Sequence, residues 1–191
     1  MTTLFPRWLL LCPFLAISCK GNNKPNTLFA KLDPEISGIH FNNTITENDS
    51  VNLIADEYAY MGSGVGVGDF NNDGLPDLFF GGSQSTCRLY LNLGNHHFRD
   101  ITKTSGLETT SWSTGISIVD INNDGYPDIY VCVSGNVPGN KRKNLLFINN
   151  HDLTFKECAA EYGLADTGYS TQAAFFDYDH DGRLEIGRAH V

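Results

Sequence analysis

The chain has 191 residues, a formal net charge of −9 and a pI near 4.9. This length is enough for one domain of ordinary size or for part of a repeat architecture. The acidic balance excludes nucleic acid as an expected partner, because affinity for nucleic acid comes mainly from Lys and Arg side chains that meet phosphates.

The N-terminal segment has the pattern of a secretory signal. Arg7 precedes an apolar run from Trp8 to Ala16 that is too short to span a bilayer. The cysteine that follows Ala-x-Ser resembles a bacterial lipobox, in which Cys19 is lipidated and becomes the mature N-terminus. Lipoboxes usually carry Leu where this chain has Ala16, so an ordinary cleaved signal with an incidental cysteine is the alternative.

These features predict a lipoprotein signal peptide over residues 1–18 and a tether over residues 19–37, of which 20–26 is polar and flexible. No later stretch is long and apolar enough to cross a membrane. We therefore expect membrane contact only through the lipid anchor. The expected location is the bacterial cell envelope, as an outer-membrane lipoprotein or at the cell surface.

The pattern is weaker between the tether and the first repeated segment. Gly38 to Phe41 is expected to form a strand, and residues 42–52 are mostly polar and loop-like. The folded domain is expected to run from residue 38 to residue 185.

Three nine-residue segments, called loops 1, 2 and 3, have the chemistry of calcium-binding loops. They span 69–77, 120–128 and 177–185, with oxygen-bearing side chains at positions 1, 3, 5 and 9 and Gly at position 6. Ca²⁺ accepts roughly 6–8 oxygen ligands, which a short loop with a sharp turn at Gly can supply. The carbonyl at position 7 is a further candidate. The predicted Ca²⁺ ligands are Asp69, Asn71, Asp73, Leu75, Asp77, Asp120, Asn122, Asp124, Tyr126, Asp128, Asp177, Asp179, Asp181, Arg183 and Glu185.

The loops differ from an EF-hand, which needs a bidentate Glu at position 12 and a helix on either side. Position 12 is Phe80 in loop 1 and Val131 in loop 2. The flanking runs, such as 65–68 and 129–133, are short, aromatic and β-branched, which is typical of strands. We therefore expect each loop to join two strands of a hairpin. Asx-turns that only cap the hairpins are the alternative, which three aligned copies disfavour.

The loops are part of a wider repeat, since they start 51 and then 57 residues apart. Met61, Trp112 and Tyr169 each stand eight residues before the first Asp of a loop. A second block, Leu-aromatic-x-Asn followed by Phe and Gly-Leu, recurs at 89–107 and 146–164. Each unit thus holds about four strands, which predicts an all-β fold of four-stranded β-propeller blades. A non-closing stack of β-hairpins is the alternative.

The residues of this repeat also carry a family resemblance. The segment G-V-G-V-G-D-F-N-N-D-G-L-P-D-L-F-F, followed by L-Y-L-N-x-G-N-x-x-F-x-D-I-T-x-x-S-G-L, resembles the FG-GAP/VCBS propeller repeats. More narrowly it resembles the ASPIC/UnbV and cartilage-acidic-protein-like group of surface and secreted proteins. The resemblance implies a seven-bladed propeller with calcium in its loops, as in integrin α-subunits, and no catalytic residue. This chain has only three such loops.

The last residues, 186–191, are predicted to be a non-native tail. Gly-Arg-Ala-His-Val is a poor core for a strand, and the heptapeptide of residues 185–191 is also what GAG ATC GGA AGA GCA CAC GTC would encode, a sequence that resembles sequencing-adapter read-through. We expect the native frame to be cut at codon 185, so that the chain holds about three of seven blades. A genuine C-terminus is the alternative.

Two functions are weighed. The first is a calcium-stabilised adhesion or recognition propeller, not an enzyme, which binds an extracellular protein or glycan through face loops such as Gly135–Lys143. The alternative is the propeller part of a secreted polysaccharide-active enzyme whose catalytic residues lie outside this fragment. Paired carboxylates for glycoside hydrolysis lie about 5–10 Å apart at a cleft, whereas the recurring Asp residues here are assigned to calcium. His96 and His97 are expected in a surface turn.

Overall fold

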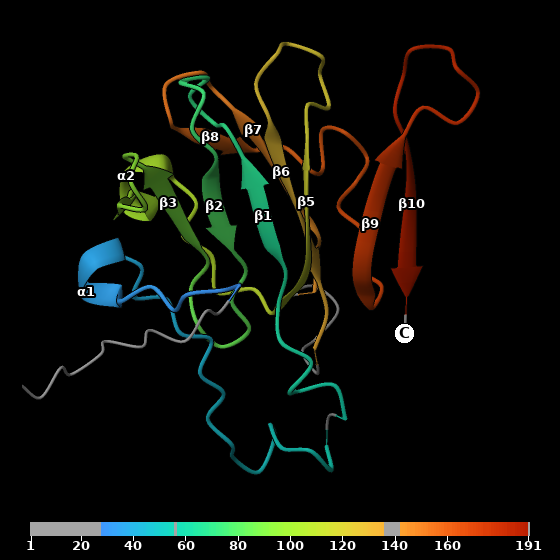
Figure 1. Ribbon diagram of the computed structural model, residues 1–191. Coiled ribbons are helices and arrows are strands. Elements are labelled where there is room, and N and C mark those ends of the chain that lie inside the picture. The colour runs from blue at the N-terminus through green and yellow to red at the C-terminus, as the bar shows by residue number, and fades with distance from the viewer. Residues whose placement is uncertain (1–27, 56, 136–141, 191) are drawn as a thin grey trace, which may run out of the picture. The chain divides into compact units, whose positions relative to one another are not determined.

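Figure 1 shows the computed structural model of the chain, which describes residues 28–55, 57–135 and 142–190. The chain divides into two units, Met1–Lys31 and Leu32–Val191. The first unit is described only over residues 28–31, so the predicted signal peptide and Cys19 lie outside the described residues. Within the described ranges, no helix has the length and apolar character needed to cross a bilayer.

The described part of the second unit is built almost entirely of short strands. In chain order its elements are α1 (Pro34–Ser37), β1 (Val65–Gly68), β2 (Asp77–Phe80), β3 (Arg88–Asn92), β4 (Phe98–Asp100), α2 (Thr102–Ser105), β5 (Ser113–Val119), β6 (Asp128–Val133), β7 (Leu145–Asn149), β8 (Phe155–Glu157), β9 (Ser170–Phe176) and β10 (Glu185–His190).

Two antiparallel sheets repeat the same four-stranded order, and we call them blade 1 and blade 2. Blade 1 has the order β1-β2-β3-β4 and blade 2 the order β5-β6-β7-β8, so every strand pairs with its neighbour in sequence. The equivalent pairs Val67↔Leu78 and Ile118↔Ile129 show that the register of the first hairpin is also repeated. This arrangement confirms the predicted all-β fold of four-stranded blades.

The third sheet contains β9 and β10, paired from Phe176↔Glu185 to Ser170↔His190 around loop 3. The prediction that the residues after Glu185 make a poor strand is wrong for 186–190, because β9 pairs with them along its length, with a register shift between Ala189 and His190. Ile186 also packs against the hydrophobic cluster around Tyr130 and Leu146. The non-native origin of this tail remains a prediction.

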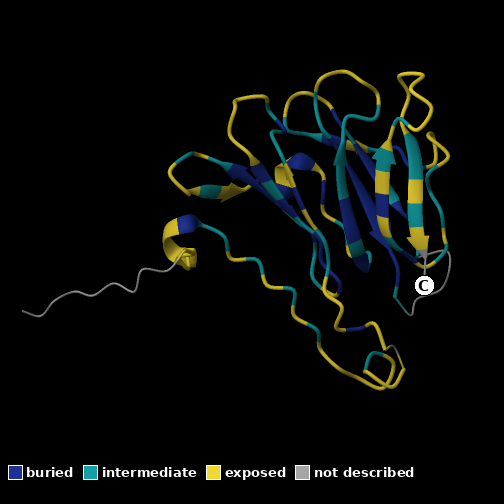
Figure 2. Cartoon of the chain, turned by 45° about the vertical axis from the view of Figure 1, so that its right-hand side comes forward, coloured by how far each residue is buried: buried dark blue, intermediate teal, exposed yellow. Residues whose placement is uncertain are grey.

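The core lies between successive sheets, where Figure 2 shows the buried residues gathered. One cluster joins residues of both blades, including Phe70, Leu89 and Ile129. A second cluster joins blade 2 to the third sheet through Tyr130 and Ala173. Each large apolar side chain that is fully buried contributes about 1.5–3 kcal/mol. A blade therefore gains its stability by stacking on its neighbours.

The first strands of the sheets, β1, β5 and β9, approach one another closely at two glycines. A Cβ on Gly64 would lie 2.5 Å from the backbone nitrogen of Ile116, and a Cβ on Gly115 would lie 2.4 Å from the carbonyl oxygen of Thr171. Both glycines stand five residues before the first Asp of their loops. Gln172 has this position in the third repeat, and its Oε1 fills the space over Gly115. Glycine at this position sets the spacing between blades.

Helix α1 differs from the sequence prediction, because it lies in the segment assigned to the tether. The Asp33 carboxylate accepts the N–H of Glu35 at 3.0 Å, and Pro34 occupies the first turn. Gly38 ends the helix with a φ of 77°, and residues 38–41 form no strand, so that expectation is wrong. The second unit begins at Leu32, and the start of the propeller domain at residue 38 stays a prediction.

Helix α2 was not predicted either. It follows β4, where the Asp100 carboxylate accepts the N–H of Thr102 at 2.9 Å. The Thr102 hydroxyl in turn accepts the N–H of Leu89 at 2.9 Å, and Gly106 ends the helix with a φ of 76°. The recurring Gly-Leu pair of the repeat thus marks the end of a helical turn that closes blade 1.

Candidate functional site

Loops 1, 2 and 3 connect β1 to β2, β5 to β6 and β9 to β10, and they lie at the same end of the three sheets (Figure 1). The predicted setting, a hairpin loop between two strands, is therefore confirmed for all three. Position 4 adopts the left-handed conformation in each loop, with φ values of 56° at Asn72, 58° at Asn123 and 61° at His180. Asn tolerates this conformation better than most residues.

Each loop is closed by the same three backbone-to-carboxylate hydrogen bonds. In loop 1 the N–H groups of Asp73 and Gly74 donate to the Asp69 carboxylate at 3.0 and 2.7 Å, and the N–H of Leu75 donates to Asp73 at 2.8 Å. Loops 2 and 3 repeat all three bonds between the equivalent residues. The carboxylates at positions 1 and 5 consequently face the inside of each loop.

The carboxylate at position 9 ties each of the first two loops to the third strand of its blade. Asp77 is fully buried and accepts the N–H groups of Phe70 at 3.0 Å and Asn92 at 2.7 Å. Asp128 does the same with Ile121 and Asn149, at 3.0 and 2.8 Å. In loop 3 the Glu185 carboxylate accepts the N–H of Tyr178 at 2.7 Å.

The electrostatics of loops 1 and 2 favour a positive charge. Burial raises the pKa of Asp77 above its ordinary value, its two N–H partners oppose that rise, and the nearby charges of Asp73 and Asp69 raise it further. The pKa of Asp128 is raised by the same combination, with Asp124 and Asp120 as the neighbouring charges. These carboxylates thus stand close enough to repel one another.

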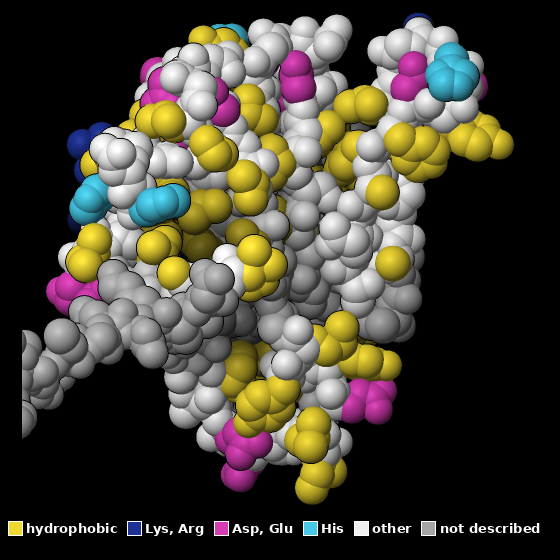
Figure 3. All heavy atoms as spheres, viewed as in Figure 1, with side chains coloured by type: hydrophobic (Ala, Val, Ile, Leu, Met, Phe, Trp, Pro, Cys, Tyr) yellow, Lys and Arg dark blue, Asp and Glu magenta, His cyan; other side chains and the backbone are white. Residues whose placement is uncertain are grey.

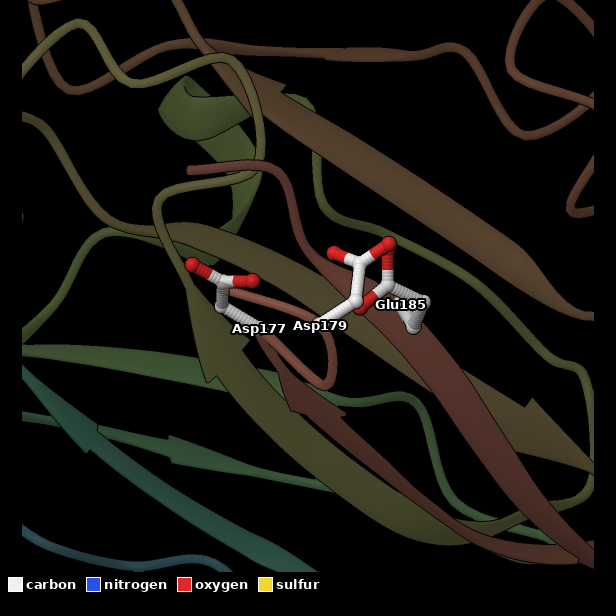
Figure 4. Close-up of side chains that lie close together, drawn as sticks. All are labelled: Asp177, Asp179 and Glu185. Atoms are coloured by element: carbon white, nitrogen blue, oxygen red, sulfur yellow. The ribbon is translucent and has the colours of Figure 1, made fainter. Parts of the chain in front are cut away.

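Loop 3 brings three of its predicted ligands together. One carboxylate oxygen from each of Asp177, Asp179 and Glu185 lies within 4.8 Å of the others, and Figure 4 shows the three side chains at the end of the β9–β10 hairpin. Arg183 approaches the remaining acid, with its Nε 3.7 Å from Asp181 Oδ2. Hard oxygen ligands at such separations fit Ca²⁺.

The hydrogen bonds within the loops are those of Asx-turns, the alternative considered from the sequence. A carboxylate oxygen offers about two lone pairs, so one that accepts a single N–H can still bind a cation; Asp124 Oδ2 is the exception, since both Asn122 Nδ2 and His151 Nε2 lie within hydrogen-bond distance of it. The side chains of all three loops are of the kind that Ca²⁺ binds, and among the described residues only loop 3 brings three carboxylate oxygens within 4.8 Å of one another. The carbonyls of Leu75, Tyr126 and Arg183 belong to the same turns and stay predicted ligands.

Loop 2 has a neighbour that the sequence analysis missed. His151, in the turn between β7 and β8, places its Nε2 2.9 Å from Asp124 Oδ2 and stacks on the Tyr126 ring at 4.1 Å. The hydrogen bond to His151 lowers the pKa of Asp124 below its ordinary value. The repeat puts Gly94 at the equivalent position in blade 1. Comparing the two turns would have identified His151 as the exception.

A pocket of about 380 Å³ lies at the opposite end of the sheets from the loops. Met61, Trp112 and Tyr169, the equivalent residues that precede β1, β5 and β9, all line it. Tyr58 and Glu57 line it as well, and no Lys or Arg is among its described lining residues. Figure 3 shows hydrophobic side chains exposed at this end of the molecule. The sequence showed the equivalence of the three residues but not their convergence.

Two predicted surface features lie partly or wholly within the described residues. His96 and His97 are exposed in the turn between β3 and β4, as expected. Of the insertion Gly135–Lys143, residues 136–141 lie outside the described residues. Gly135 lines the pocket, and the guanidinium of Arg142 lies 3.8 Å from the ring centre of Tyr169. Both ends of the insertion thus reach the pocket or its wall.

Comparison with known proteins supports the repeat. Residues 42–131 match the family model described as an FG-GAP-like repeat. Over 174 residues the chain is 28% identical to cartilage acidic protein 1 of Xenopus tropicalis, which covers 91% of this chain and 26% of the relative. The mouse and human proteins of that name are each 26% identical over 179 residues, with the same shares covered. The chain therefore spans about a quarter of the length of these curated relatives.

Proposed function

Because the chain carries an FG-GAP-like repeat region and is homologous to cartilage acidic protein 1, we propose that it is a calcium-stabilised β-propeller that recognises an extracellular protein or glycan. The observation that carries this proposal is the threefold recurrence of one acidic loop, with one hydrogen-bond pattern, at one end of the sheets. The chain would be displayed on a bacterial cell envelope by a lipid on Cys19.

In this proposal the calcium ions are structural. Carboxylates at positions 1, 5 and 9, the side chain at position 3 and the carbonyl at position 7 would hold each ion, with water completing the shell. Each ion would join the end of one strand to the start of the next and would offset carboxylate repulsion.

Removal of calcium tests this part of the proposal. Chelation should lower the melting temperature of the parent protein reversibly, because binding only to the folded state stabilises it. The double variant Asp73→Ala, Asp124→Ala should lose most of this calcium response. A matched control, Asp152→Ala, changes an exposed acid in the β7–β8 turn and should keep the response. A melting temperature indifferent to chelator and to the double variant would remove calcium from the proposal.

The same preparations separate recognition from catalysis. We expect no turnover of a polysaccharide panel by the parent protein, with or without calcium. Calcium-independent turnover would instead favour the propeller of a polysaccharide-active enzyme.

The aromatic pocket is the proposed contact surface for the ligand. It has an appropriate size, since ligand pockets span about 300–1,000 Å³, and its described lining is rich in aromatic side chains, with the Arg142 guanidinium stacked on Tyr169 at its wall. Trp8 and Trp112 are the two tryptophans of the chain. Trp8 lies in the predicted signal peptide, so in the chain that starts at Cys19 the emission of Trp112 reports on this pocket alone.

A glycan array and a panel of extracellular proteins can be screened for a saturable change in Trp112 emission. Tyr169→Ala should weaken the response about tenfold or more, because it removes one wall of the pocket. Tyr178→Ala, which removes a more exposed tyrosine in loop 3, is the control and should leave binding unchanged. Binding that responds to Tyr178 but not to Tyr169 would move the contact surface to the calcium end.

A further inference from the structure

Two hydrogen bonds cross the boundary between the blades, one from loop 1 to loop 2 and one from the end of β7 to loop 1. The side-chain amide of Asn72, at position 4 of loop 1, donates to the carbonyl oxygen of Gly125 in loop 2 at 3.0 Å. The side-chain amide of Asn149, at the end of β7, donates to the carbonyl oxygen of Phe70 in loop 1 at 2.9 Å. Each loop is thus held partly by residues of the other blade.

Asn149 is the more constrained of the two residues. It is buried, its backbone N–H donates to the Asp128 carboxylate at 2.8 Å, and its side-chain oxygen accepts the N–H of His151 at 2.9 Å. Its side-chain amide also lies 3.3 Å from the carbonyl oxygen of Pro127. All hydrogen-bonding groups at its side chain are therefore used, and partners in blade 2 together with Phe70 of the neighbouring blade fix the orientation of the amide.

The acceptor of this bond lies between two predicted ligands. Phe70 separates Asp69 from Asn71, and its own N–H donates to Asp77 at 3.0 Å. A continuous series of hydrogen bonds therefore runs from Asp128 through Asn149 and Phe70 to Asp77. It connects position 9 of loop 2 with positions 2 and 9 of loop 1.

Blade 1 contains the equivalent residue without the link. The backbone N–H of Asn92 donates to Asp77 at 2.7 Å, as that of Asn149 does to Asp128. The side-chain amide of Asn92, however, donates to the carbonyl of Pro76 in its own blade at 2.8 Å. Both asparagines donate a backbone N–H to the position-9 carboxylate of their own blade. Of this pair, only Asn149 also donates its side-chain amide to a loop of the other blade.

We propose that Asn149, with Asn72 as a second link, is a positioning residue that couples calcium binding at loops 1 and 2. This coupling rests on the proposed function, because calcium is the ligand that would order both loops. An ion on loop 2 fixes the Asp128 carboxylate and hence Asn149, which holds the backbone of loop 1 at Phe70. Loop 1 then loses less conformational freedom when it binds its own ion, so its affinity rises. The effect must be reciprocal, because both affinities share one coupling free energy.

Calorimetric titration of the full chain with CaCl₂ measures the coupling, in a background where Asp177→Ala silences loop 3. Silencing loop 2 with Asp120→Ala and Asp124→Ala should lower the affinity of loop 1 about fivefold or more, the smaller end of typical coupling. Adding Asn149→Ala should abolish that difference, whereas Asn92→Ala should preserve it. Equal affinities of loop 1 with and without a functional loop 2 would overturn the coupling.

A measurement without metal separates this inference from the calcium proposal. In chelator, Asn149→Ala should speed amide hydrogen exchange at Phe70, Asp73 and Gly74 several-fold, although loop 1 itself is unchanged. Asn92→Ala should leave exchange in loop 2 as it is in the parent. If the parent binds no calcium, the calcium proposal fails. The exchange experiment still tests whether Asn149 holds the backbone of loop 1. Unchanged exchange in loop 1 of Asn149→Ala overturns the link whatever the calcium result.

Discussion

At the scale of single residues, the three kinds of acid in a loop have different tasks. Asp69 and Asp73 are partly or fully exposed and accept N–H groups from within their own loop. Asp77 is fully buried and accepts N–H groups from Phe70 and from Asn92 on another strand. Position 9 is therefore part of the folded framework as well as a candidate ligand.

This difference predicts that Asp77→Asn destabilises the protein even in chelator. An Asn side chain accepts hydrogen bonds only through its amide oxygen. One of the two buried N–H groups, of Phe70 or of Asn92, would therefore face the NH₂ group and lose its acceptor, at a cost of about 1–3 kcal/mol. Asp73→Asn keeps the acceptor for Leu75 and should change stability only when calcium is present. Urea unfolding of both variants, with and without chelator, compares them. Equal stability of Asp77→Asn and the parent in chelator would contradict the framework role.

At the scale of strands, the glycines of the inner edge decide how closely the sheets stack. Gly115 faces the backbone of Thr171, which cannot move without displacing β9. Gly66 faces only side-chain atoms, those of Ile118 and Ile116, which can shift without moving the backbone of a neighbouring strand. The same added methyl group therefore has different consequences at the two positions.

We predict that Gly115→Ala lowers stability by more than Gly66→Ala, with a loss of about 1–3 kcal/mol typical of overpacked sites. The variant should also speed hydrogen exchange in β9, because that strand must shift. Thermal unfolding and exchange of the two variants give the comparison. A larger loss for Gly66→Ala would show that the blade boundary is looser than these contacts indicate.

The sequence predicted most strands because each strand follows from local residues. Alternation of apolar residues, flanking turns and repetition were sufficient for β1 to β9 and for the three loops. The helical turn α1 was missed because its apolar content is small and its stability comes from the Asp33 cap and Gly38. The strand β10 was missed because its residues have low strand propensity and form a strand through pairing with β9.

The missed parts of the site depend on contacts between blades. Asn149 was recognised as part of the repeat, but whether its amide turns inward or toward Phe70 depends on the neighbouring blade. The pocket likewise forms only when residues separated by more than 50 positions gather at one end. Periodicity along the chain carries no information about such distances.

At the scale of the whole molecule, the acidic loops dominate the charge balance. The formal charge is −9, and one divalent ion in each of three loops would bring it to −3. Native isoelectric focusing should therefore place the protein at a higher pI with calcium than with chelator. The double variant Asp73→Ala, Asp124→Ala should show a smaller difference between the two conditions. The same pI in calcium and in chelator would contradict ion binding by the loops.

The order of the strands within the blades has a consequence for how the protein folds after it leaves the ribosome. Every strand pair in blades 1 and 2 joins neighbours in the chain, so the sequence separations of paired residues stay short and loop closure costs little entropy. A blade can acquire its hydrogen bonds as soon as its own residues emerge. The apolar faces of a blade stay exposed until the next repeat has been synthesised, because each hydrophobic cluster contains residues of two successive sheets. Folding should consequently advance from the N-terminus in steps of one repeat, each new sheet covering the exposed face of the one before it.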